Sequence, residues 1–216
     1  MNKEWSEKNK KMQSLIGTEA TYREGIDVLI ELRDDLFQQI TSIVNTYPQE
    51  AFWQMPFAKA EGYHSKTLGY SMWHIFRIED IVAHTIIMQD SQILFTEGYL
   101  ERTGSPIITT GNELKGEAIA EFSKQLDIKA VCEYCAAVKN STDAMLNKLE
   151  YKDLKRKFTA EDKKRVVESN SVSTDEDAVW LIDYWCDKDV RGLIKMPFSR
   201  HWIMHIEAMC RIKSKL

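Results

Sequence analysis

The sequence predicts an all-α protein, with four long helices and several short accessory helices. Three long segments carry apolar residues at steps of three and four, the period of a helix with one buried face. Strands alternating with helices, glycine-rich phosphate loops and regular hairpin spacing are absent from the 216 residues. These observations favour a four-helix bundle with a crossover connection.

The composition is that of an ordinary globular domain, with 44% hydrophobic and 29% charged residues. The formal net charge is -4, so no basic surplus favours binding to nucleic acid. No apolar run approaches the roughly 20 residues that span a bilayer, and the N-terminal residues lack a signal-peptide core. We therefore expect a cytoplasmic protein with reduced cysteines and no membrane or nucleic-acid partner.

The expected organisation is a single domain over residues 20–216, preceded by an N-terminal extension or short helix over residues 1–19. Thr21 and Glu24 are spaced as in a capping box, which marks the start of a helix. Apolar periodicity extends this first long helix to about Asn45.

The second long helix is expected from about Thr67 to Gln89. It is apolar on most faces and should therefore be buried on most faces. Buried polar side chains need partners, which makes four of its residues conspicuous: His74, Arg77, Glu79 and Asp80. The aromatic-rich residues 46–66 before it should pack over one end of the bundle or line a pocket.

A long mixed connection over residues 90–126 fits a bundle with a crossover. Asp127 is the expected N-cap of a third long helix that ends near Leu149. A charged connection with one short helix after Thr159 should follow.

The chain then approaches its last long helix through a short apolar helix and a turn. Ser173 and Glu176 are spaced as a capping box for the short helix. Residues 191–197 are expected to form the turn, and Ser199 is the expected N-cap of the last helix.

His201 and His205 on this last helix are four residues apart, so their imidazoles lie about 40° apart on one face. Two imidazoles at this spacing can reach one metal ion. A third ligand must come from elsewhere, and His74 is the best candidate because it lies in the most buried helix. His84 lies about 80° from the face of His74, and His64 lies in a loop.

Three histidine ligands leave at least one coordination position open, as in catalytic or ligand-exchanging sites. A divalent ion there lowers the pKa of bound water towards ~7, or binds a thiol as thiolate. Metalloprotease chemistry is not supported, because no glutamate follows His201. The alternative from spacing alone is a set of hydrogen-bonded core histidines.

Two short motifs carry a resemblance to a known family. Trp73–Asp80, WHIFRIED, resembles the second-helix signature of the DinB-like (YfiT-like) putative metal-dependent proteins. Arg191–Pro197, followed by His201 and His205, resembles the last-helix signature of that family. The resemblance implies a four-helix bundle, a homodimer, and a metal triad of one second-helix histidine with the pair on the last helix. Residue by residue, these are His74, His201 and His205.

The resemblance also implies a metal-binding protein and leaves its activity open. Relatives include thiol-dependent transferases, which suggests a metal-dependent enzyme of the thiol-transferase or hydrolase type with a small-molecule thiol as partner. Zinc or nickel suits imidazole ligands, and iron or manganese also binds them. The alternative is a non-catalytic dimeric bundle whose histidines are structural or whose metal site is vestigial.

Three neighbours of these histidines are candidates for the pocket or for supporting the ligands. Arg77 should face nearly the same way as His74, where it could hold an anionic group or form an ion pair within the core. Trp73 and Trp202 adjoin the predicted ligands and could wall the pocket or pack in the core. Cys132 and Cys135 are expected to be core cysteines, because no second cysteine pair completes a zinc ribbon.

Overall fold

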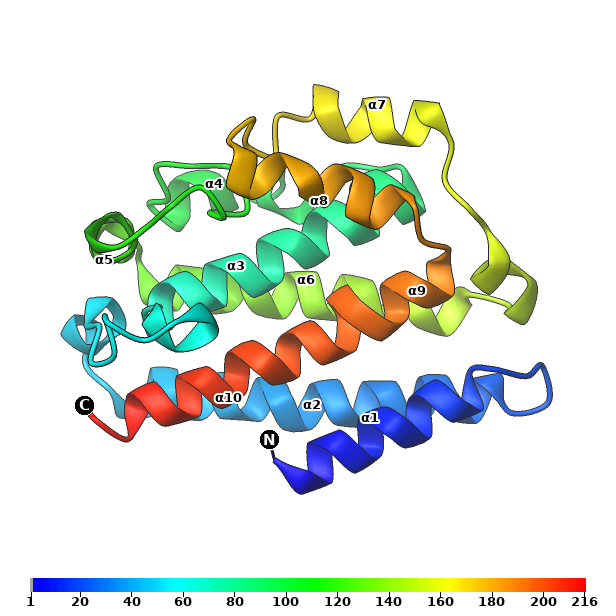
Figure 1. Ribbon diagram of the computed structural model, residues 1–216, viewed down its shortest axis with the longest axis horizontal. Coiled ribbons are helices and arrows are strands. Elements are labelled where there is room, and N and C mark those ends of the chain that lie inside the picture. The colour runs from blue at the N-terminus through cyan, green and yellow to red at the C-terminus, as the bar shows by residue number, and fades with distance from the viewer. Residues whose placement is uncertain (1) are drawn as a thin grey trace.

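The computed structural model describes residues 2–216, and this part of the chain is helical without β-strands. Figure 1 shows the long helices lying roughly side by side, with shorter helices covering one side. The all-α prediction is therefore confirmed. Within residues 2–216 no helix is long and apolar enough to cross a membrane.

Helices α1 (Lys3–Leu15) and α2 (Tyr22–Thr46) form an antiparallel pair at the N-terminal end of the chain. The expected short first helix and long second helix are both present. The predicted capping box at Thr21 does not form, because the Thr21 hydroxyl donates to the carbonyl oxygen of Leu15 at 2.7 Å. The preceding turn therefore uses the hydroxyl that would have capped α2.

The central helical segment comprises α3 (Leu68–Asp80) and a continuing π-helical stretch, η3 (Ile81–Met88). All of α3 is buried, as its apolar surround predicts. The aromatic-rich segment before it contains two short 3-10 helices, η1 (Gln49–Trp53) and η2 (Gly62–Ser65).

The crossover connection carries three short helices before the third long one. They are η4 (Ile93–Phe95), α4 (Tyr99–Arg102) and α5 (Glu117–Gln125). Helix α6 (Ile128–Lys148) then begins at Asp127, whose carboxylate accepts a hydrogen bond from the backbone N–H of Ala130 at 3.0 Å. The predicted cap and end of this helix are confirmed.

Three short helices follow: η5 (Tyr151–Lys155), α7 (Ala160–Glu168) and α8 (Glu176–Cys186). The predicted start after Thr159 is confirmed, with its side chain capping α7. The predicted capping box of Ser173 with Glu176 is wrong. Asp175 caps α8 instead, accepting from the backbone N–H of Asp177 at 2.9 Å.

The last helical run is longer than expected. Helix α9 (Val190–Lys195), the π-helical η6 (Met196–Arg200) and α10 (His201–Lys213) follow one another without a break. The expected turn over residues 191–197 is therefore wrong. The Ser199 cap is wrong too, because its hydroxyl donates to the carbonyl oxygens of Ile194 and Lys195, each at 3.0 Å. The wider π turn accommodates Pro197, which has no N–H to donate.

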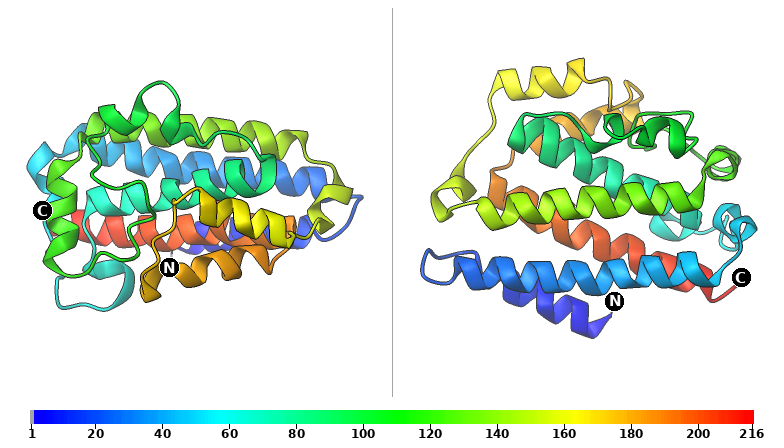
Figure 2. Two further views of the ribbon diagram at one scale, coloured as in Figure 1. Left: turned by 90° about the horizontal axis from the view of Figure 1, so that it is seen from above. Right: turned by 180° about the vertical axis from the view of Figure 1, so that it is seen from behind.

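Four long helices close a ring around the core. Both α2 and α3 pack against α6 on one side and against α10 on the other. Figure 2 shows this arrangement from above and from behind. Helix α7 packs on η3 and on α8, so the short helices cover the outer side of the central segment. This packing brings the middle of α3 against the start of α10.

Candidate metal centre

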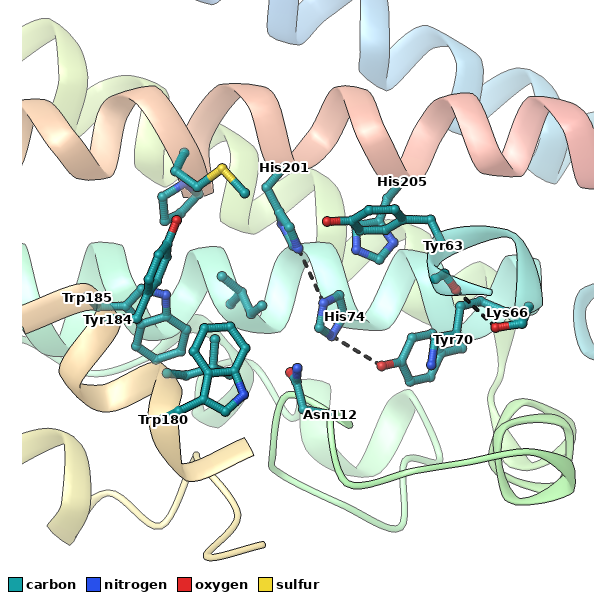
Figure 3. Close-up of a pocket in the computed structure, with 16 residues that line it drawn as sticks. Tyr63, Lys66, Tyr70, His74, Asn112, Trp180, Tyr184, Trp185, His201 and His205 are labelled. Atoms are coloured by element: carbon teal, nitrogen blue, oxygen red, sulfur yellow. Dashed lines mark hydrogen bonds between the residues drawn. The ribbon is translucent and has the colours of Figure 1, made fainter. Parts of the chain in front are cut away.

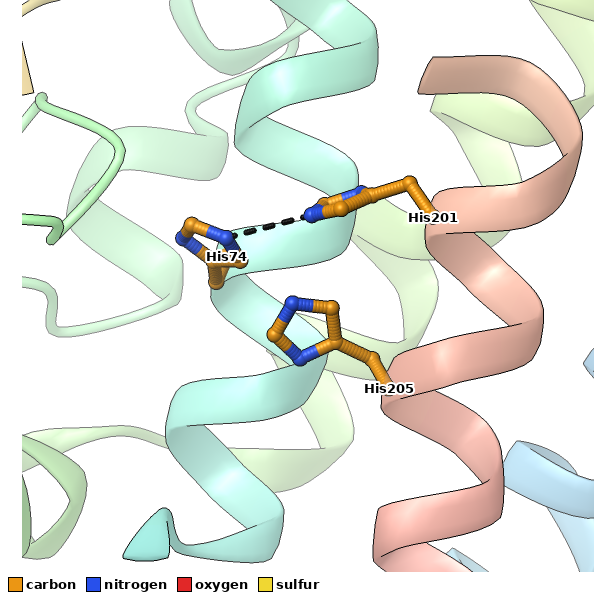
Figure 4. Close-up of side chains that lie close together, drawn as sticks. All are labelled: His74, His201 and His205. Atoms are coloured by element: carbon orange, nitrogen blue, oxygen red, sulfur yellow. Dashed lines mark hydrogen bonds between the residues drawn. The ribbon is translucent and has the colours of Figure 1, made fainter. Parts of the chain in front are cut away.

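Three histidines from two helices meet at the contact between α3 and α10. Figure 4 shows His74 pointing from α3 towards His201 and His205 on α10. One nitrogen of each ring lies within 4.8 Å of the others, and all three side chains are buried. The Nε2 atoms of His74 and His201 are 3.2 Å apart, although 127 positions separate them in the chain.

The tautomer of His74 is fixed by the backbone. Its Nδ1 lies 2.8 Å from the carbonyl oxygen of Thr110. A carbonyl oxygen can only accept, so Nδ1 carries the proton and Nε2 presents its lone pair to the other two histidines. Metal-binding histidines are commonly oriented by such a hydrogen bond at the second ring nitrogen.

Several nitrogens of the cluster have no hydrogen-bond partner among the described residues. They are Nδ1 of His201 and both ring nitrogens of His205. An unpaired buried polar atom costs about 1–3 kcal/mol, so three of them in one place need an explanation. A divalent ion bound by one nitrogen of each ring would supply a partner for one of the two nitrogens of His205.

The spacing also fits an ion. Two nitrogens that each lie about 2.1 Å from one tetrahedral ion are about 3.4 Å apart. The separation between His74 and His201 is 3.2 Å. The other separations in the cluster are all within 4.8 Å. These residues therefore fit a divalent metal.

The three imidazoles are neutral at pH 7. Burial lowers the pKa of His74 to about 4, the hydrogen bond to Thr110 opposes this shift, and the charge of Lys66 adds to it. Burial and the neighbouring imidazoles hold the pKa of both His201 and His205 well below the usual range. Neutral imidazole is the form that binds metal, so the cluster needs no deprotonation to act as a ligand set.

One face of α3 holds the loop segment Ile108–Gly111 against the site. Arg77, Trp73, His74 and Tyr70 donate in turn to its four consecutive carbonyl oxygens, at 2.8, 2.9, 2.8 and 3.1 Å. The donors are spaced as one helical face requires. Trp73 and Arg77 therefore support His74 indirectly, by fixing the segment that carries its hydrogen-bond acceptor.

Arg77 does not reach the cavity next to the histidines. Its guanidinium forms a fully buried ion pair with Asp80 at 2.8 Å and donates to Gln92 and to the hydroxyl of Tyr134. Of the two roles considered for Arg77, the structure shows the buried ion pair.

Trp202 faces the core as well. Its indole N–H donates to Glu79 at 2.8 Å, and Glu79 also accepts two hydrogen bonds from the buried guanidinium of Arg33. Arg33 donates to the carbonyl oxygen of Phe198 at 3.1 Å and lies over the Trp202 ring. This network anchors the stretch on either side of His201 to α2 and α3.

A cavity of about 410 Å³ opens beside the histidines, and all three line it. Figure 3 shows aromatic side chains around it. Its aromatic lining consists of Tyr63 from η2, Tyr70 from α3, and Trp180, Tyr184 and Trp185 from α8. Trp73 and Trp202 are not among the lining residues. The contribution of α8 was not predicted from the sequence. Its aromatic residues indicated a short apolar helix and gave no sign of a role in the pocket.

The other two histidines lie outside the cluster. His84 bonds through Nδ1 to Asp90 at 2.7 Å, and His64 lies in η2. Cys135 is buried and Cys132 is half-buried, and burial raises the pKa of both thiols. Among residues 2–216, His74, His201 and His205 form the one group with the geometry of a metal site.

No protein-family model matches the chain, and no curated protein matches it either. The functional argument therefore rests on the geometry of the cluster and its cavity.

Proposed function

We propose that the chain is a DinB-like metal-binding protein, in which His74, His201 and His205 hold one divalent ion within a four-helix bundle. The observation that carries the proposal is the convergence of three buried, neutral imidazoles, two of which carry ring nitrogens without a hydrogen-bond partner among the described residues. The donor set favours zinc or nickel, with iron or manganese as further candidates. Purely structural histidines would find hydrogen-bond partners in the core, so the unpaired nitrogens argue against that alternative.

The same site supports a proposal of metal-dependent transferase or hydrolase chemistry, with a small-molecule thiol as co-substrate of the transferase. Three protein ligands leave a coordination position free, and the cavity adjoins all three. A bound divalent ion supplies an activated water or stabilises a thiolate. The residues of the chain orient the ligands through the Thr110 carbonyl and surround the reactants with aromatic walls.

Metal analysis tests the proposal most directly. The protein, purified without a histidine tag, should contain about one ion per chain after supplementation with zinc, nickel, iron or manganese. His74→Ala, His201→Ala and His205→Ala should each lose the ion. His84→Ala is the matched control, because His84 is a buried histidine outside the cluster, and it should retain the metal. Protein that binds none of the four metals would overturn the proposal.

Catalysis is tested separately by screening small thiols for conjugation to electrophiles, with and without metal. A metal-dependent rate that disappears in His205→Ala would support the transferase. A rate unchanged by that substitution would show that the histidine site does not catalyse the reaction. The family resemblance also implies a homodimer, and sedimentation of the purified chain would reveal its oligomeric state.

A further inference from the structure

The side chains that line the cavity include a positively charged group and no negatively charged one. Lys66 lines it beside the histidines, and no aspartate or glutamate does so. No ion pair with Lys66 occurs among the described residues. Glu113 contributes to the raised pKa of Tyr70 after the larger effect of burial, yet it lies outside the lining and accepts a hydrogen bond from Thr109.

The ammonium group of Lys66 contacts Tyr70, the aromatic neighbour of His74. It sits 4.9 Å from the centre of the Tyr70 ring, and that ring stacks on His74 with centroids 5.3 Å apart. Its charge contributes to the lowered pKa of both His74 and His205. Figure 3 shows Lys66 and Tyr70 on the same side of the cavity. A ligand group bound at the histidines is therefore within the field of the ammonium.

The rest of the lining is mostly flat and apolar. The Tyr63 ring meets His205 edge-on, with centroids 4.6 Å apart. Trp180, Tyr184 and Trp185 of α8 line the cavity too, and Trp180 remains 48% exposed although it is a large apolar residue. A cavity of about 410 Å³ lies in the range that holds a small organic molecule. Its aromatic surfaces suit a ligand with a planar apolar ring system.

We propose that the site takes a small carboxylate with a planar apolar body. The carboxylate lies between the histidine-bound ion and Lys66, and the body lies against the aromatic residues of α8. A divalent ion held by neutral imidazoles, together with an ammonium group, leaves a concentrated positive charge that no lining carboxylate offsets. An anionic ligand supplies that missing charge. The role of the ion rests on the proposed function, whereas the role of Lys66 does not.

Calorimetric titration of the full chain with 2-naphthoate tests this proposal, in zinc-loaded and metal-free protein. We expect 2-naphthoate to bind zinc-loaded protein at least tenfold more tightly than uncharged 2-naphthamide and than acetate, which lacks the apolar body. Lys66→Met should weaken 2-naphthoate about tenfold in both forms, and Lys66→Arg should restore most of the affinity. Lys59→Met is the matched control, because Lys59 is an exposed lysine outside this cavity, and it should change nothing.

Trp180→Ala separates the apolar body from the charge, and it should weaken 2-naphthoate while leaving acetate unchanged. Equal affinities for 2-naphthoate and 2-naphthamide, or a Lys66→Met variant with undiminished affinity, would overturn the proposal. Inorganic phosphate that binds more tightly than 2-naphthoate would also overturn it, because a bare anion would then suffice. If the protein binds no metal, the proposed function fails, yet the titrations of metal-free protein and of Lys66→Met still decide whether Lys66 recognises a carboxylate.

Discussion

The two unpaired nitrogens of His205 lead to a prediction that separates a metal ligand from a core residue. His205 is 2% exposed, and neither ring nitrogen has a hydrogen-bond partner. In metal-free protein no described residue compensates the desolvation of these two nitrogens. Leucine offers an apolar side chain of smaller but comparable bulk with no group to satisfy. We predict that His205→Leu stabilises the metal-free protein, whereas substitution of a buried residue usually destabilises.

The expected size of the effect follows from two opposing contributions. Relief of the two unpaired nitrogens is worth about 2 kcal/mol, when each is taken at the lower end of the range of about 1–3 kcal/mol for one buried polar atom. Loss of the edge-on contact between His205 and the Tyr63 ring removes about 0.5–1.5 kcal/mol. The net gain is about 1 kcal/mol, which raises the melting temperature by about 2–4 °C for a chain of this size.

Zinc should reverse the ranking of the two proteins. At a free zinc concentration 100 times the dissociation constant, binding stabilises the wild-type chain by about 2.7 kcal/mol. That gain corresponds to a rise of about 5–10 °C. His205→Leu should lose most of this zinc-dependent stabilisation, because the substitution removes one of the three ligands and only two remain. Differential scanning calorimetry with and without zinc measures both effects in one pair of scans.

His84→Gln serves as the control, because it removes a buried imidazole outside the cluster and should leave the zinc-dependent rise intact. The reasoning would be refuted if metal-free His205→Leu melted several degrees below the wild type and zinc raised both proteins equally. That pattern would make His205 an ordinary core residue.

The pKa of His74 and the buried pair of Arg33 with Glu79 each give a further prediction. In the folded chain the pKa of His74 is about 4, below the roughly 6.5 of an unfolded histidine, so the unfolded state binds more protons between these values. Stability from neutral His74 is therefore present above pH 6.5 and falls by about 3 kcal/mol as the pH approaches 4. Urea midpoints of metal-free protein at pH 7.5 and 4.5 measure this loss of stability. The loss should be smaller in His74→Leu. An equal loss in both proteins would show that His74 is not its cause. Arg33→Met leaves the carboxylate of Glu79 buried without its partner, and we expect urea unfolding to show a loss of about 3–5 kcal/mol. Adding Glu79→Gln should recover part of it, and a double variant no more stable than Arg33→Met would show that the unpaired charge is not the cause.

The long helices could be predicted from the sequence because helical periodicity is a local property. Apolar residues at steps of three and four placed α2, the α3 region and α6 with ends close to those observed. The caps at Asp127 and Thr159 were also predictable, since their hydrogen bonds stay within one turn. The failed caps at Thr21 and Ser199 have a common cause. Each hydroxyl donates to a carbonyl of the preceding segment, a competing partner that residue type alone does not reveal.

The hydrogen bonds of Trp202 to Glu79, and of Arg77 to Gln92 and Tyr134, could not be predicted, because these partners lie far away in the chain. The ion pair of Arg77 within the core was one of its two expected roles, and Asp80, three residues further on, provides it. Helical geometry places Arg77 near the face of His74, yet Asp80, Gln92 and Tyr134 bind its guanidinium within the core. Trp202 follows His201 directly, yet it turns away to donate to Glu79. Sequence adjacency to a ligand therefore did not place either side chain in the cavity.

By itself the sequence determined the helical class, the paired spacing of His201 and His205, and the candidacy of His74 as a third ligand. These follow from composition and from the 3.6-residue repeat, which act over a few residues. Only the tertiary structure decided that α3 and α10 cross where the three histidines lie, that Thr110 fixes the tautomer of His74, and that α8 supplies aromatic walls. Such contacts arise from the packing of distant helices around the crossover, and no local pattern records which faces will meet.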